Sequence, residues 1–208
     1  MPKQTFFNLS EEKRQRIIDE SIEEFAEYYY HKASISRIVK NAGIAKGSFY
    51  QYFEDKNDLF RYIIEKIGEK KVKYLGDIMA NINKLNFFEV LREMYIAGIK
   101  FAIENPKFQQ IGDDFLKDND VQLKEEIFGD SIPKSNELFV ALINQGIDKG
   151  DIDSSIDIGL TANIITNLSI SIGEYFINEI KGTDYMEIMT LVDNMLYILK
   201  NGIKNKEG

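Results

Sequence analysis

The side chains of this chain best placed to do chemistry lie in the stretch SISRIVKNAGIAKGSFYQYF, residues 34–53. Their types favour recognition of double-stranded DNA. Lys46 can reach guanine O6 and N7 or a phosphate, Gln51 can pair bidentately with adenine, and Tyr50 can contact a thymine methyl group or a phosphate. Gly47 has no side chain, so its backbone can approach a groove closely. The remaining predicted DNA contacts are Ser36 and Arg37 near the groove edge, and Ser48, Tyr52 and Lys56 at phosphates.

A helix-turn-helix is predicted to hold these side chains. Apolar residues recur at i, i+3, i+4 and i+7 in the first part of the stretch, which is typical of a short amphipathic helix. These residues are Ile35, Ile38, Val39 and Ala42. Gly43 follows, and glycine takes the left-handed conformation that ends a helix without a Cβ clash. A second short helix then begins near Lys46, and such a helix can enter the major groove.

The second helix is expected to have a core side and an exposed side. Phe49 and Phe53 point to the core in this reading. The exposed residues are expected to be Lys46, Ser48, Tyr50, Gln51 and Tyr52. A helix of about eight residues is not stable alone, so an earlier helix, capped by Ser10, must support it. The core stripe expected on that earlier helix is Ile18, Ile22, Phe25 and Tyr29.

The distribution of charge supports DNA binding. Residues 28–53 contain no Asp or Glu but four cations, in a chain whose formal net charge is −8. Residues 1–56 hold nine Lys/Arg and nine Asp/Glu, whereas the remainder holds 17 and 25. A local basic patch is what phosphate neutralisation requires, and the acidic remainder should repel nucleic acid. The alternative is a solvated helical hairpin of a bundle, which would not explain why the glycine turn, the acid-free window and the exposed aromatic residues coincide.

Residues 10–62 or so resemble the N-terminal domain of the TetR family of bacterial transcriptional regulators. The resemblance is carried by FAEYYYHKASIS and RIVKNAGIAKGSFYQYFEDKNDLF, with the core AG-I-A-KG-S-F-Y-Q-Y-F-x-x-K-x-x-L. The chain departs from the family at Tyr29, where glycine is usual, at Val39, where alanine is common, and at Ala45, where a capping serine is usual. The resemblance implies a ligand-responsive repressor that binds a palindromic operator as a homodimer and is released by a small, largely apolar effector.

Helical periodicity throughout the chain predicts an all-α protein of two domains. The N-terminal helix-turn-helix DNA-binding domain spans 1–56, and the C-terminal helical domain for effector binding and dimerisation spans 57–208. A helix over about 55–80, capped by Asp55 and running towards Met79, connects them. Further helices are expected near 86–104, 106–118, 121–128, 132–149, 155–180 and 184–203.

The family resemblance places an effector pocket and a dimer interface in the second domain. The pocket candidates are Tyr95, Phe101, Phe108, Phe115, Phe139, Ile143, Asn163, Asn167, Leu168, Glu174 and Tyr175. The last two helices are apolar on more than one side or at near-heptad spacing, so two copies could form a four-helix interface. The interface candidates are Ser169, Gly173, Met189, Val192, Leu196 and Leu199. The alternatives are that each aromatic residue is plain core and that these helices close a monomeric core.

The sequence gives little support for a catalytic function, because His31 is the only histidine and cysteine is absent. A Cys/His or Ser/His/Asp constellation cannot be assembled, and we expect no enzyme activity, metal or cofactor. The absence of cysteine favours a reducing, cytoplasmic compartment. No uncharged apolar run reaches 18 residues, so no membrane partner is expected. The alternative function is a helical small-molecule-binding or carrier protein that no longer reads DNA.

Overall fold

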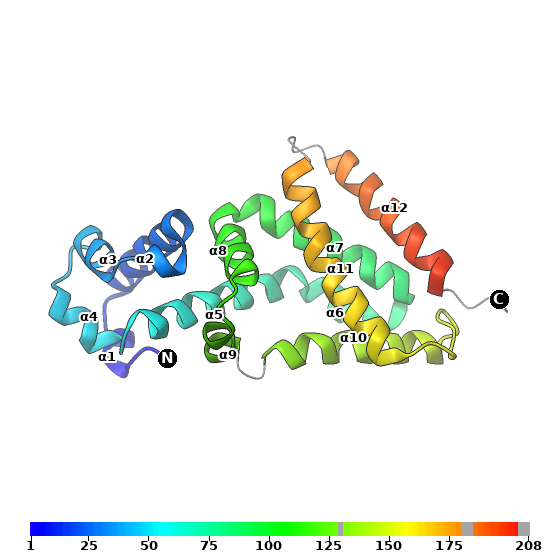
Figure 1. The fold of residues 1–208 in the computed structure, drawn as a ribbon, viewed down its shortest axis with the longest axis horizontal. Coiled ribbons are helices and arrows are strands. Elements are labelled where there is room, and N and C mark those ends of the chain that lie inside the picture. The colour runs from blue at the N-terminus through cyan, green and yellow to red at the C-terminus, as the bar shows by residue number, and fades with distance from the viewer. Residues whose placement is uncertain (129–130, 180–184, 204–208) are drawn as a thin grey trace. The chain divides into compact units, whose positions relative to one another are not determined.

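The computed structural model confirms the all-α prediction (Figure 1). It describes residues 1–128, 131–179 and 185–203, without the side chains of 77, 128, 131–136, 170–174, 176–179, 185–186, 188 and 203. The helices are α1 (Gln4–Phe7), α2 (Glu11–Lys32), α3 (Ile35–Asn41), α4 (Lys46–Tyr52), α5 (Lys56–Tyr74), α6 (Gly76–Asn81), the short 3-10 helix η1 (Ile82–Lys84), α7 (Phe87–Glu104), α8 (Pro106–Lys117), α9 (Val121–Phe128), α10 (Ser131–Asp148), α11 (Ile158–Glu179) and α12 (Tyr185–Ile203). The six helices predicted beyond residue 85 are all present, with ends within three residues of the predicted ones.

The chain forms two compact units that interleave in the sequence. The first comprises residues 1–71 and 104–129, and the second comprises 72–103 and 130–208. Helix α5 therefore passes from the first unit into the second, and α7 leads back to α8. Helices α8 and α9 belong with the helix-turn-helix, where α8 packs against α2. Sequence periodicity could not reveal this, because membership of a unit depends on tertiary contacts.

Helix α2 begins where its capping sequence predicts. The Ser10 hydroxyl accepts the backbone N–H of Lys13 at 3.4 Å, and Glu11 and Glu12 follow in the first turn. The expected core stripe was placed one residue too late for most of its length. The buried residues are Ile17, Ser21, Glu24 and Phe25. Tyr29 was expected in the core but is 49% exposed, because the helix is kinked at that residue.

Helix α5 begins as predicted but ends early. The Asp55 carboxylate accepts the backbone N–H of Asp58 at 2.8 Å, which confirms the predicted cap. The helix was expected to continue towards Met79, but it ends at Tyr74. The Leu75 N–H donates to the Val72 carbonyl at 3.1 Å, which makes a tighter turn than that of an α-helix, and a new helix starts at Gly76. Glycine inside a helix costs about 1 kcal/mol relative to alanine, which favours the break at this point.

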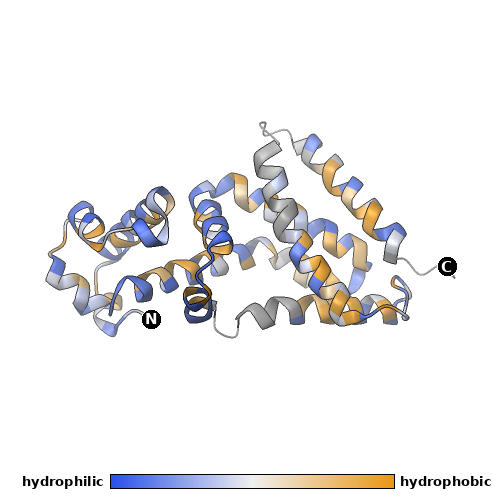
Figure 2. Cartoon of the chain, viewed as in Figure 1, coloured by the Kyte–Doolittle hydropathy of each residue, from blue (hydrophilic) through white to orange (hydrophobic). Residues whose placement is uncertain are grey.

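The second unit has an apolar core contributed mainly by α7, α10, α11 and α12, whose apolar faces are visible in Figure 2. Its most buried members are Phe87, Val90, Leu91, Leu142, Ile143, Ile152, Ala162, Ile165 and Val192. Gly146 lies where α10 meets the turn that follows it. A Cβ there would come within 2.7 Å of Ile152 Cδ1 and 3.1 Å of Phe87 Cβ, so any larger residue would force these side chains to shift. Among the described residues, no helix is both long and apolar enough to cross a bilayer.

Candidate nucleic-acid interface

The predicted helix-turn-helix is formed by α3, a tight turn and α4. Ile38 and Ala42 are fully buried on one face of α3. Gly43 adopts a φ of +65°, which is the left-handed conformation predicted for the residue that ends α3. The Ile44 N–H bonds to the Val39 carbonyl at 2.9 Å and closes the turn. Helix α4 then begins at Lys46, as expected.

Helix α4 has one buried and one exposed side. Phe49 and Phe53 are fully buried, as predicted, whereas Lys46, Gly47, Tyr50 and Gln51 are exposed. Ser48 is half-buried and Ser36 of α3 is exposed. The expected exposure of Tyr52 was wrong, because Tyr52 is only 6% exposed. Its ring packs 6.2 Å from that of Phe6, in the small helix α1 that periodicity did not predict.

Glu24 is a site residue that the sequence reading missed. Its side chain is only 4% exposed, and its Oε1 accepts the backbone N–H of Ser34 at 2.7 Å. Arg37 Nε donates to both carboxylate oxygens, at 2.9 and 3.0 Å. An acid at a core position of α2 was the available signal, since a buried carboxylate requires cationic or N–H partners. Glu24 thus ties the start of α3 to α2.

Arg37 is held by more than this ion pair. Its guanidinium carbon lies 4.0 Å from the centroid of the Tyr28 ring, and its terminal nitrogen donates to the Lys32 carbonyl at 2.9 Å. The hydrogen bond to the Glu24 carboxylate raises the pKa of Arg37 above its usual value. Arg37 is still 44% exposed, so it positions α3 and also presents positive charge.

Lys56 also has structural partners that the sequence reading did not predict. Its ammonium donates to the carbonyls of Tyr30 at 2.7 Å, Ala33 at 3.3 Å and His31 at 3.4 Å. Burial lowers the pKa of Lys56, and Glu24 partly opposes that shift. These carbonyls lie at the C-terminal end of α2, where a cation is favoured. A phosphate contact by Lys56 would compete with these bonds.

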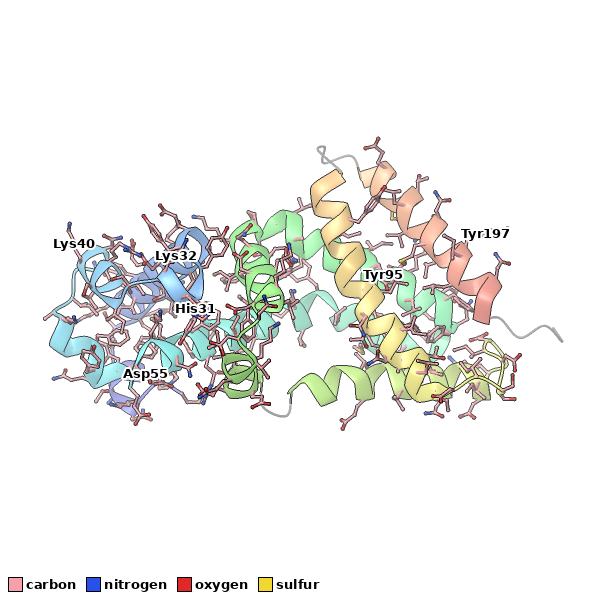
Figure 3. The ribbon with its side chains drawn as sticks, in the orientation of Figure 1. His31, Lys32, Lys40, Asp55, Tyr95 and Tyr197 are labelled. Carbon is pink, nitrogen blue, oxygen red and sulfur yellow. The ribbon has the colours of Figure 1, made fainter. Side chains whose placement is uncertain are left out.

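Tyr29 and His31 shape the end of α2. Tyr29 has φ 57° and ψ 165°, and it is the one non-glycine residue with positive φ in the described part of the chain. It stands at the position where the resembling family usually has glycine. His31 Nε2 lies 2.8 Å from Asp118 Oδ2, at the end of α8. Lys32 and Lys40 extend from the outer sides of α2 and α3 (Figure 3).

Comparison with known proteins identifies this arrangement. Residues 17–63 match the family model described as bacterial regulatory proteins, tetR family. A TetR family transcriptional regulator from Chloroflexus aurantiacus is 30% identical in sequence, with a TM-score of 0.75 over 99% of this chain and 100% of that chain. The chain belongs to the TetR family. It is a DNA-binding transcriptional regulator of that family.

Relatives of this TetR-family chain include regulators of lipid metabolism. The fatty acid metabolism regulator protein of Bacillus subtilis is 26% identical over 93% of this chain and 97% of its own length. The Bacillus subtilis regulator FadR in complex with stearoyl-CoA has the same fold, with 23% identity and a TM-score of 0.75 over 91% of this chain and 98% of that chain. The probable acrEF/envCD operon repressor of Escherichia coli is 23% identical over 88% of this chain and 84% of its length. These relatives are transcriptional regulators rather than enzymes.

The predicted effector residues are divided between the two units. Phe108 and Phe115 belong to the first unit, where the Phe115 ring packs 5.4 Å from that of Phe60. Phe101, Phe139 and Ile143 are buried in the second unit. Leu168 is half-buried, Asn163, Asn167 and Tyr175 are exposed on α11, and the Glu174 side chain lies outside the described residues. The half-buried Tyr95 hydroxyl lies 2.8 Å from the Ser169 hydroxyl, inside an otherwise apolar region of the second unit.

Two of the predicted dimer residues face the core of the second unit rather than solvent. Val192 and Leu196 are buried in the core of the second unit. Leu199 packs against that core, Met189 and Ser169 are half-buried, and the Gly173 position falls outside the described side chains. A heptad-like apolar pattern is satisfied equally by the chain's own core and by a partner, so periodicity alone does not predict which of these residues are buried within the chain. The same helices have other apolar residues that are exposed.

Proposed function

We propose that this chain is a cytoplasmic repressor that binds a palindromic operator as a homodimer and leaves it when a fatty-acyl effector binds. The DNA-binding part of this proposal is supported by helix α4, which has one buried side and one exposed side. Phe49 and Phe53 fix its orientation in the core, so Lys46, Tyr50 and Gln51 are presented together on the exposed side. Helix α4 is the recognition helix in this proposal, in which Gln51 reads adenine and Lys46 contacts guanine or phosphate.

The proposed dimer uses the exposed apolar residues of α11 and α12. Leu160, Ile164 and Tyr175 recur on one side of α11, and Tyr197 and Ile198 stand on α12. Tyr197 and Ile198 are 70% and 72% exposed, which is unusually high for large apolar side chains in a helix. A second copy would cover them. Dimerisation would then set two recognition helices about 34–36 Å apart, or a multiple of that distance, in successive major grooves.

The proposed effector is a fatty-acyl thioester, bound in the second unit. The apolar core of that unit suits an acyl chain, and the Tyr95–Ser169 hydroxyl pair offers a polar partner within it. Two similar regulators are connected with fatty acids or an acyl-CoA by their names. The chain itself gives a route for the signal. Helix α7 of the second unit leads directly into α8, and α8 packs on α2 beneath the helix-turn-helix.

The test uses the full-length protein and DNA selected from a random pool. Wild-type protein should enrich a palindromic site and bind it with an affinity that falls steeply with salt. Acyl-CoAs of increasing chain length should then weaken this binding by about 5–150-fold, and the DNA should weaken acyl-CoA binding by the same factor. Failure to enrich any sequence would contradict the operator proposal and favour a ligand carrier. An enriched site whose affinity ignores every acyl-CoA would contradict only the effector proposal.

A further inference from the structure

The C-terminal end of the recognition helix is completed by another part of the chain. The last four carbonyl groups of a helix have no partner inside it, and in α4 these belong to residues 49–52. The Phe53 N–H takes the first, that of Phe49, at 2.9 Å. The other three need partners from elsewhere, since α4 ends at Tyr52.

Two residues before α2 supply all three partners. Lys3 Nζ donates to the Tyr50 carbonyl at 3.0 Å, and the Lys3 backbone N–H donates to the Tyr52 carbonyl at 2.8 Å. The Thr5 hydroxyl donates to the Gln51 carbonyl between them. Three successive carbonyls of the recognition helix are therefore bonded to one short segment more than 40 residues away in the sequence.

Phe6 fastens this segment to the same end of the helix. Its ring is fully buried and lies 4.8 Å from the ring of Phe53 and 6.2 Å from that of Tyr52. It also packs edge-to-face on Tyr62 of α5, with centroids 5.5 Å apart. The hydrogen bonds and the aromatic packing act on one place, namely the last turn of α4.

We propose that residues 3–6 form a clip that positions the recognition helix for specific DNA reading, with Lys3 and Thr5 as positioning residues. The inference rests on the proposed function of α4 as the base-reading element. Helix α4 has seven residues and no side-chain hydrogen bond at its N-cap, Ala45. A helix of that length is not stable alone, so its geometry depends on what holds each end. The clip holds the end that carries Tyr50 and Gln51.

The clip acts on the residue that is proposed to read a base. The Thr5 hydroxyl holds the backbone carbonyl of Gln51, while the Gln51 side chain faces the DNA in the proposed complex. Without that bond the last turn of α4 can fray, and a correctly placed Gln51 must be selected from several geometries. Specific binding must supply the free energy that orders Gln51, whereas non-specific binding to phosphates does not require Gln51 to be ordered. Thr5 carries no charge, so its substitution leaves the phosphate attraction unchanged.

The test compares Thr5→Val with Thr5→Ser, which keeps the hydroxyl. Thr161→Val serves as a matched control, because the Thr161 hydroxyl in α11 of the second unit also donates to a backbone carbonyl, that of Asp157 just before the helix. Thr5→Val should bind the selected site about fivefold more weakly, the equivalent of one hydrogen bond, and should bind scrambled DNA like wild type with the same salt slope. Thr5→Ser and Thr161→Val should match wild type on both DNAs. Equal affinity of Thr5→Val and wild type for the selected site would overturn the proposal.

A second measurement does not depend on any DNA. Hydrogen exchange of the free protein should be faster at the amides of α4 in Thr5→Val and in Lys3→Met, and unchanged in α10 of the second unit. Unchanged exchange in α4 would overturn the clip even if no DNA site were found. Faster exchange together with a failure to enrich any site would leave the clip standing and contradict only the proposed operator binding.

Discussion

The ammonium of Lys56, in the first turn of α5, lies 4.5 Å from the centroid of the Tyr30 ring and bonds to the Tyr30 carbonyl. One side chain therefore joins the start of α5 to the C-terminal end of α2. A lysine predicted from its position to contact phosphate thus makes a cation–π contact and a helix cap within the protein. Lys46 and Lys56 were both predicted from the sequence to contact DNA, but in the structure Lys56 makes these contacts within the protein, whereas Lys46 is exposed.

Lys46→Met should affect DNA binding and leave stability nearly unchanged, whereas Lys56→Met should reduce stability. Lys46 is exposed at the start of α4, so its loss should lower the salt slope of DNA binding by about one unit and change the free energy of unfolding by less than about 0.5 kcal/mol. Lys56→Met should reduce that free energy by about 1–2 kcal/mol, since it removes carbonyl bonds at the end of α2. Urea unfolding and salt-dependent fluorescence anisotropy measure the two effects. A salt slope lowered equally by both substitutions would show that Lys56 leaves its cap to bind phosphate.

Gly47→Ala should separate folding from DNA binding. A Cβ at Gly47 would meet nothing within 4 Å in the protein, so the substitution should leave the free energy of unfolding unchanged or raise it by up to about 1 kcal/mol. Affinity for the selected site should fall, because the added methyl group occupies space that the proposed complex needs between backbone and groove. Gly98→Ala in α7 is the matched control, since a Cβ there also meets nothing. Wild-type affinity of Gly47→Ala would refute the close approach.

Glu24→Gln tests the buried ion pair at the start of α3. Gln keeps the shape of the side chain but removes the charge that pairs with Arg37, so the free energy of unfolding should fall by about 1–3 kcal/mol. The neighbouring Glu23 is the control, because its side chain is 52% exposed and pairs with an equally exposed Lys107. Glu23→Gln should cost less than about 1 kcal/mol. Similar losses at both positions would mean that burial of Glu24 adds nothing.

Sequence reasoning predicted the parts of this fold that depend on local chemistry. Ser10 and Asp55 cap the starts of α2 and α5 with their side chains, and Gly43 ends α3 through its own backbone conformation. These roles can therefore be predicted from residue type. The burial of Phe49 in α4 and of Phe53 directly after it was predicted from helical periodicity alone. The family resemblance supplied the function, and the 30% identity with a TetR family regulator over 99% of this chain confirmed the family.

The failures involve residues whose surroundings come from distant parts of the chain. Tyr52 has an aromatic body and a polar tip, and only the packing of Phe6 decides that the ring is buried. Val192 fits its own core as well as a partner's surface, and periodicity cannot distinguish the two. Phe115 packs on Phe60 in the first unit, and this grouping of α8 with α5 depends on tertiary contacts that periodicity does not show. The carbonyl bonds of Lys3 and Thr5 left no pattern in the sequence.

Tyr29→Gly should give a more stable protein than Tyr29→Ala, whereas glycine is normally the less stable of the two in a helix. At φ 57° and ψ 165°, Tyr29 occupies a region that costs a residue with a Cβ about 1–3 kcal/mol. Tyr29→Ala removes the same ring but keeps the Cβ, so comparison of the two variants isolates the backbone. The Gly variant should be more stable than the Ala variant by roughly 1 kcal/mol in urea unfolding. A more stable Ala variant would contradict the strain, since that is the order in an ordinary helix.

Ile198→Asp should disrupt the proposed dimer without unfolding the chain. Ile198 is 72% exposed on α12, so a charge there costs a single protomer almost nothing. In a two-fold symmetric interface the same side chain is buried twice, once from each copy. Burying a large aliphatic side chain is worth about 1.5–3 kcal/mol, so the two copies together should raise the dimer dissociation constant by about 10²–10⁴-fold. Sedimentation equilibrium measures that constant, and the affinity for a full palindrome should fall while that for one half-site should not. Val121→Asp on α9 is the control, because Val121 is 66% exposed and lies outside the proposed interface. If Ile198→Asp sediments as wild type does, the two copies do not meet at this part of α12.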